Sequence, residues 1–225
     1  MSSLRMHKTL AGQGVRPATM PHTLSEVFPA HPTDASAVGF VLSRLPRTNA
    51  PILWVQDRLS RKEAGRPALV GIGVDRPVII VDLSRAADVL WAMEDGLRCR
   101  ALGAVIGEVW GDPPSLDFTA TKRLALRAEA ANVACWLIRR AASPDLSAAR
   151  DRWRIASLLS APHPHDAQAP GSPRWALDLF RSRRSKPGQW VATYDRAADR
   201  VHLAPSARDR AVEPRDGALR ERAAG

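Results

Sequence analysis

Four short, almost wholly apolar runs set the strongest limit on what this chain can fold into. They are residues 52–55, 78–81, 104–109 and 133–138. Apolar runs of this length, bounded by turn residues, are typical of strands that are buried on both faces of a parallel sheet. The sequence therefore predicts four such strands, and they need helices to cover both faces of the sheet.

Helix-length segments flank and separate these runs, at residues 34–45, 84–97 and 119–131. Ser84 is the expected cap of the second helix, and residues 57–62 are expected to form a polar turn. Strands that alternate with helices predict right-handed βαβ crossovers. The fold class that we predict is therefore α/β, with a parallel sheet flanked by helices.

The last third of the chain has a different pattern of predicted elements. Residues 153–155, 175–180 and 189–194 resemble strands, and the connections between them are too short for helices. This pattern predicts antiparallel strands that extend the parallel sheet. The connection 181–188 (RSRRSKPG) is expected to be a basic hairpin tip, and residues 160–173 are expected to be a surface loop.

Length and composition suit one globular domain. The chain has 225 residues, of which 45% are hydrophobic and 25% are charged. We expect a flexible arm at 1–21, a domain at 22–204 and a disordered charged tail at 205–225. The sequence has no apolar run long enough for a membrane helix and no secretory signal, so we expect a cytoplasmic protein with no membrane partner.

The charge is unevenly distributed. Of the formal net charge of +10, +7 lies in residues 139–225, which hold 17 basic and 10 acidic residues. A basic half favours a polyanionic partner, with nucleic acid as the first candidate, although an arginine-rich composition has the same effect. Arg181, Arg183, Arg184 and Lys186 of the predicted tip are candidates to bind DNA phosphates or a partner protein, and a solvated hairpin tip is the alternative.

No phosphate-binding loop is present. The segment where it should lie reads EVFPAHPTDASAVGF, and a Gly-Lys-Ser/Thr sequence occurs nowhere in the chain. Tight ATP binding by that route, a cofactor and a metal ion are therefore not expected. Asp57 and Glu108 stand at strand ends, where carboxylates can hold magnesium or orient water. Without a phosphate loop, the pattern favours structural roles for both.

Several segments resemble known families. The run GVDRPVIIVDLSRAADVLWAMEDGLRCRALGAVIGEV is similar to the stretch of RecA-type recombinases that leads into the Walker B strand. The segments LDFTATKRLALRAE and SPRWALDLFRSRRSKPGQW, together with DVLWAMEDGLR, resemble the ImuA family of RecA/SulA-like accessory proteins. The resemblance spans about residues 22–195.

This resemblance implies a RecA-like core that lacks a Walker A loop. It also implies a non-catalytic accessory or scaffold protein of SOS-induced, error-prone translesion synthesis. The implied partners are a catalytically inactive Y-family polymerase homologue, an error-prone C-family DNA polymerase and RecA, with DNA as a further candidate. Two alternatives stay open: a SulA-type cell-division inhibitor and a degenerate RecA-like ATPase.

The resemblance also implies positions for individual residues. Glu108 matches the Walker B acidic position, and Asp57 matches the strand-end position of the recombinase's catalytic glutamate. Arg181 and Arg183 match two basic positions that reach a neighbouring subunit's nucleotide in RecA filaments. Because the Walker A loop is missing, these nucleotide-site positions are expected to be degenerate.

Overall fold

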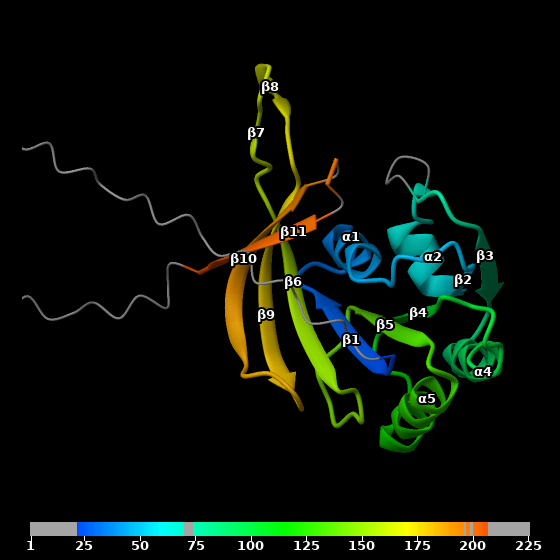
Figure 1. The fold of residues 1–225 in the computed structure, drawn as a ribbon. Coiled ribbons are helices and arrows are strands. Elements are labelled where there is room, and N and C mark those ends of the chain that lie inside the picture. Colours follow the sequence, from blue (N-terminus) through cyan, green and yellow to red (C-terminus); the bar gives the residue numbers. More distant parts are fainter. Residues whose placement is uncertain (1–21, 70–73, 196, 199, 207–225) are drawn as a thin grey trace, which may run out of the picture.

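A computed structural model describes residues 22–69, 74–195, 197–198 and 200–206. The predicted arm at 1–21, and the predicted tail apart from residues 205 and 206, lie outside the described residues. Most of the described strands form one nine-stranded sheet, in the order β11-β10-β9-β6-β1-β5-β4-β2-β3 (Figure 1). Its strands are β1 (Leu24–Pro29), β2 (Ile52–Asp57), β3 (Val78–Leu83), β4 (Ala104–Trp110), β5 (Ala134–Arg140), β6 (Asp151–Leu158), β9 (Arg174–Ser182), β10 (Gly188–Asp195) and β11 (Arg200–Pro205).

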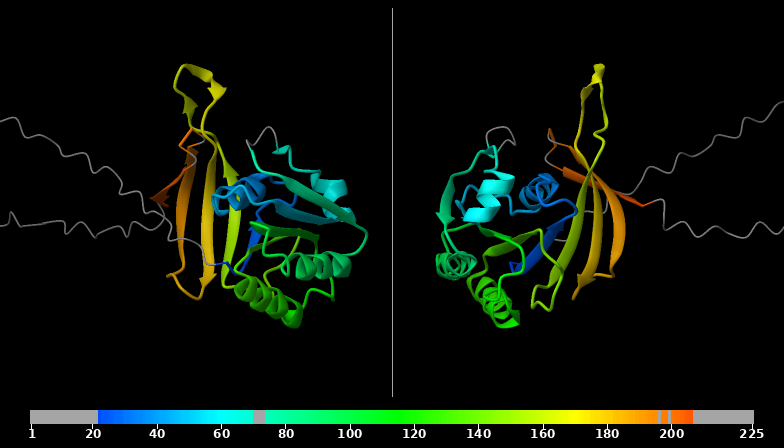
Figure 2. Two further views of the ribbon diagram at one scale, coloured as in Figure 1. Left: turned by 45° about the vertical axis from the view of Figure 1, so that its right-hand side comes forward. Right: turned by 180° about the vertical axis from the view of Figure 1, so that it is seen from behind.

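The sheet is parallel from β3 to β6 and antiparallel from β6 to β11. Helices lie on both faces of its parallel part, with α1 on one face and α4 and α5 on the other (Figures 1 and 2). The described helices are α1 (Ser36–Ser43), α2 (Arg58–Ala64), α4 (Ala86–Gly96) and α5 (Phe118–Ala131). The predicted α/β class and its antiparallel extension are therefore confirmed.

Each face of the sheet has its own apolar core. On the α1 face, the ring of Phe40 lies among the indoles of Trp136, Trp153 and Trp175. Gly39 permits this approach, because a Cβ atom there would lie 2.9 Å from Cζ2 of Trp175. Trp175 belongs to β9, so its packing against α1 holds the antiparallel extension onto the parallel sheet.

Several local expectations were wrong. The polar turn at 57–62 is helix α2, and α4 begins after Arg85 with no side-chain cap from Ser84. The expected surface loop at 160–173 contains a small hairpin of β7 (Pro162–His163) and β8 (Asp166–Pro170), which stands out from the sheet in Figure 1. The run at 78–81 forms a strand, but it is the half-exposed edge strand β3.

Two strands of the large sheet lie outside all sequence expectations. They are β1, which lies near the centre, and β11, which lies at one edge. Among the described helices, none is both long enough and apolar enough to cross a membrane.

Candidate functional site

The carboxyl ends of the parallel strands form the edge at which sheets of this class bind ligands. The loop between β1 and α1, residues 30–35, lies at this edge, and so do the ends of β2, β4 and β5. Glu108 and Asp57 are both here, as expected for strand-end residues. The environment of each carboxylate decides what it can do.

Glu108 is fully buried beneath this edge. One carboxylate oxygen accepts hydrogen bonds from Trp54 Nε1 at 2.7 Å and Gln56 Nε2 at 2.9 Å. The other accepts a hydrogen bond from Arg140 Nε at 2.6 Å. Burial raises the pKa of Glu108, and the neighbouring positive charge of Arg140 opposes that rise. Both carboxylate oxygens of Glu108 therefore accept hydrogen bonds from side chains of the same protein.

Arg140 continues this network into the loop that follows β1. Its Nη1 donates to the carbonyl oxygen of Pro32 at 2.7 Å and lies 3.4 Å from that of Asp34. A phosphate-binding loop turns backbone N–H groups toward an anion. This loop instead turns carbonyl oxygens toward a buried cation, so its polarity at this point is the opposite of the one that a phosphate needs.

Asp34 occupies the amino end of α1. Its Oδ1 accepts hydrogen bonds from Ser36 N at 2.8 Å and Ser157 Oγ at 2.6 Å, and its Oδ2 accepts one from Ser157 N at 2.8 Å. Partial burial works to raise the pKa of Asp34, but these hydrogen bonds outweigh it and lower the pKa below its usual value of 3.8. The amino end of a helix attracts anions, and at α1 the Asp34 carboxylate already occupies that position.

Asp57 joins three elements at the same edge. One oxygen accepts the N–H of Ser60 at 2.6 Å and so caps α2, while the other accepts the N–H of Trp110 at the end of β4 at 2.9 Å. Gln56 is in register with Glu108, and successive strand residues point to opposite faces. Asp57 and Glu108 therefore project from opposite faces of the sheet and do not converge on one metal ion.

The predicted basic residues gather at the other edge of the sheet. Arg181 is the last residue but one of β9, and the other three lie in the connection to β10. Because β9 is antiparallel to β6, this tip lies beside Asp151 at the amino end of β6. By strand register Glu108 is level with Trp153, two residues beyond Asp151, and β4 and β6 are three strand spacings apart, about 14 Å, so the tip and Glu108 are separated mainly across the sheet.

Within the tip, Arg184 differs from its neighbours. Its guanidinium pairs with Asp151 at 2.9 Å, whereas no ion pair of Arg181 or Lys186 occurs among the described residues. All four basic residues are exposed. Arg44, at the end of α1, adds a further cation: burial lowers its pKa to about 10, Asp151 opposes this, and the charge of Arg184 lowers the pKa further.

A second buried charge network was not expected from the sequence. Glu26 of β1 accepts hydrogen bonds from Arg152 Nε at 2.7 Å and Ser147 Oγ at 2.9 Å. The Arg152 guanidinium lies 5.3 Å from the ring centroid of Phe28 and 5.2 Å from that of Phe180. The two hydrogen-bond partners of Glu26 are more than 120 residues away in the sequence, so no local pattern could have revealed them.

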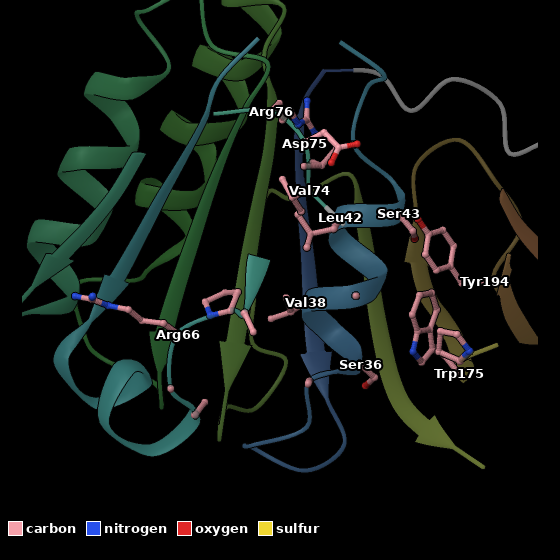
Figure 3. A pocket seen from close by; sticks show the side chains of 18 of the residues that line it. Ser36, Val38, Leu42, Ser43, Arg66, Val74, Asp75, Arg76, Trp175 and Tyr194 are labelled. Carbon is pink, nitrogen blue, oxygen red and sulfur yellow. The ribbon is translucent and has the colours of Figure 1, made fainter. Parts of the chain in front are cut away.

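A groove of about 1110 Å³ runs beside α1 (Figure 3). Val38, Leu42 and Val74 line one side of the helix, and Trp175 and its stacked neighbour Tyr194 lie on the other. Its volume exceeds the roughly 300–1,000 Å³ of pockets that enclose drug-sized ligands. The groove has both apolar and polar side chains, and it reaches the loop after β1, because Thr33, Ser36 and Arg140 also line it.

Comparison with known proteins identifies relatives that match about three quarters of the chain. No family model matches the chain. It is similar to two curated relatives, each named Protein ImuA, from Caulobacter vibrioides strains NA1000 / CB15N and ATCC 19089 / CIP 103742 / CB 15. In both comparisons the sequences are 30% identical over 185 residues, which cover 76% of this chain and 72% of the relative. The chain therefore belongs to the ImuA family.

Proposed function

We propose that this chain is a non-catalytic accessory protein of damage-induced mutagenesis. In this proposal it recruits or positions an error-prone polymerase complex during SOS-induced translesion synthesis. Its partners would be the inactive Y-family polymerase homologue, the C-family polymerase and RecA, as the family resemblance implies. Membership of the ImuA family supports the general role.

One observation carries the non-catalytic part of the proposal. The loop after β1 is occupied by other groups of the chain, because Arg140 donates to its carbonyl oxygen at Pro32 and to Glu108, while Asp34 accepts the N–H of Ser36 at the amino end of α1. A nucleotide phosphate placed there would meet the Asp34 carboxylate and would have to displace a buried ion pair. Removing one member of such a pair costs several kcal/mol, so the arrangement opposes nucleotide binding.

Two surfaces remain for assembly. The tip with Arg181, Arg183 and Lys186 is exposed and cationic, which suits DNA phosphates or an acidic protein surface. The groove beside α1 offers apolar and aromatic side chains of the kind that anchor protein partners. Neither surface includes Asp57 or Glu108.

Affinity capture tests the proposal. Tagged full-length protein is recovered from DNA-damaged cells, with and without nuclease, and its partners are identified by mass spectrometry. Recovery of both polymerase-related partners after nuclease treatment is the expected result. Recovery of the tubulin-like division protein alone would instead identify a SulA-type inhibitor, and recovery of DNA-tethered proteins alone would overturn the scaffold role.

A further inference from the structure

One face of the antiparallel part of the sheet carries no described helix. Helix α1 packs on the other face of β6 and β9, while α4 and α5 pack against β1–β5. The face of β6, β9, β10 and β11 that points away from α1 is therefore without a helix, as Figures 1 and 2 show. We call this surface the open face. An antiparallel sheet can leave one face to solvent, so the fold itself needs no cover there.

The strand register identifies the side chains of the open face. Trp153 and Ile155 belong to the core beneath α1, so Arg154 between them projects to the open face. Residues that are paired across neighbouring strands lie on the same face, which extends the assignment from β6 to β11. The solvent-accessible charged side chains placed there are Arg154, Arg174, Asp178, Arg181, Asp195 and Arg200.

Most of the positive charge on the open face is not used within the protein. Arg154 pairs with Asp178 at 3.3 Å, and its guanidinium lies 4.3 Å from the ring centroid of Phe180. Among the described residues, no ion pair is formed by the other three arginines of this face, which are Arg174, Arg181 and Arg200. Since Arg181 also belongs to the basic tip, the open face and the tip form one cationic surface that attracts acidic groups.

A hollow of about 190 Å³ lies within the open face. Ala156, Ala176 and Val191 line it, and the polar side chains of Arg154 and Gln189 lie beside them. Its volume is below the roughly 300–1,000 Å³ of small-molecule pockets, so it suits a single apolar side chain of a larger partner. Protein interfaces concentrate their binding energy in such anchored side chains, with polar contacts around them.

The charge of this surface discriminates between its possible occupants. Residues 1–21 of the chain hold three basic and no acidic residues, and residues 207–225 hold five arginines and four acidic residues. A second copy carries a formal net charge of +10. None of these offers the net negative charge that a cationic surface favours.

Nucleic acid also fits this face less well than an acidic protein does. The Phe180 ring could stack on a base, but the guanidinium groups of Arg152 and Arg154 already lie against it. The Asp178 carboxylate beside the hollow would repel phosphates, while the hollow itself accepts an apolar side chain.

We propose that the open face and the tip bind an acidic segment of a partner protein. One apolar side chain of that segment fills the hollow, and its carboxylates pair with Arg174, Arg181 and Arg200. This inference rests on the proposed function, because it describes the surface that a recruited protein presents to this chain.

Site-specific photocrosslinking in DNA-damaged cells tests the proposal. Val191→p-benzoylphenylalanine places the crosslinker beside the hollow in tagged full-length protein, and crosslinked peptides are sequenced by mass spectrometry after nuclease treatment. The expected crosslink joins position 191 to a segment of a partner protein in which acidic residues outnumber basic ones. The same replacement at Leu126, which is 52% exposed on α5, is the matched control and should not reach that segment.

The crosslinked segment, made as a fluorescent synthetic peptide, then measures the contribution of charge. Arg174→Glu with Arg181→Glu places carboxylates opposite carboxylates and should weaken peptide binding at least about tenfold by fluorescence anisotropy. Arg58→Glu with Lys122→Glu changes the net charge equally at exposed positions of α2 and α5, and it should leave the affinity unchanged.

Several results would overturn the proposal. These are a crosslink from position 191 to residues 1–21 or 207–225, to a second copy, or only to material that nuclease removes. Equal losses of affinity in the two charge variants would do the same. If polymerase-related partners are captured but none crosslinks at position 191, this inference fails and the proposed function stands. If no partner survives nuclease treatment, both fail.

Discussion

At the residue scale, the Arg140–Glu108 pair is the centre of the site. Arg140→Met leaves a fully buried carboxylate without its cation, so we expect the free energy of unfolding to fall by about 3–5 kcal/mol. The double variant Glu108→Leu with Arg140→Met removes both charges and should recover most of that loss. Urea unfolding followed by circular dichroism measures both. A loss below about 1 kcal/mol for Arg140→Met, the size of a surface pair, would contradict a buried pair.

Asp34 gives the site a pH dependence with a defined sign. Because hydrogen bonds lower its pKa in the folded protein, the carboxylate stabilises the fold above its unfolded value of 3.8. That contribution is lost as the pH falls through the lowered folded pKa. The melting temperature of Asp34→Asn should therefore change less than that of the wild type in this acidic range. Equal pH dependence in both proteins would contradict the role assigned to Asp34.

Some residues of the candidate site could be predicted from the sequence, and others could not. Glu108 and Asp57 are recognisable because each ends an apolar run, and Asp34 stands two residues before α1 in a segment typical of helix starts. Arg140 carries no such signal. Its partner Glu108 is 32 residues away, and only the register of β4 with β5 places the two side chains on one face.

At the element scale, the burial and pairing of strands explain why the sequence pattern missed β1 and placed β3 wrongly in the interior of the sheet. Strand β1 was missed because Ser25 and Glu26 interrupt its apolar run, and the buried charge of Glu26 is compensated by distant residues. Strand β3 has the most apolar run of the sheet, yet it lies at the edge. An apolar run predicts a strand, but the order of strands in the sheet decides which are buried.

The basic tip is an element whose role can be tested separately from folding. Charge reversal at Arg181, Arg183 and Lys186 should weaken partner or DNA binding with little change in melting temperature, because all three are exposed. Arg184 is left unchanged, since its ion pair with Asp151 would confound the result. Lys122→Glu, an exposed cation on α5, is the control. Unchanged recovery of partners and unchanged DNA binding would show that the tip is only solvated.

At the scale of the whole molecule, the sheet separates two kinds of surface. At the carboxyl ends of its parallel strands, Asp34, Arg140 and Glu108 are hydrogen-bonded to other residues of the chain, while the cationic tip lies at the opposite edge and β3 lies at one side (Figures 1 and 2). The chain therefore keeps an α/β architecture, and its cationic tip is exposed to solvent.

The most direct test of this account is nucleotide binding by the purified full-length protein. Equilibrium dialysis against radiolabelled ATP with magnesium, run beside a RecA recombinase as a positive control, should detect no saturable binding up to about 1 mM. Saturable binding, or ATP hydrolysis that Glu108→Gln abolishes, would contradict the account and identify a working nucleotide site.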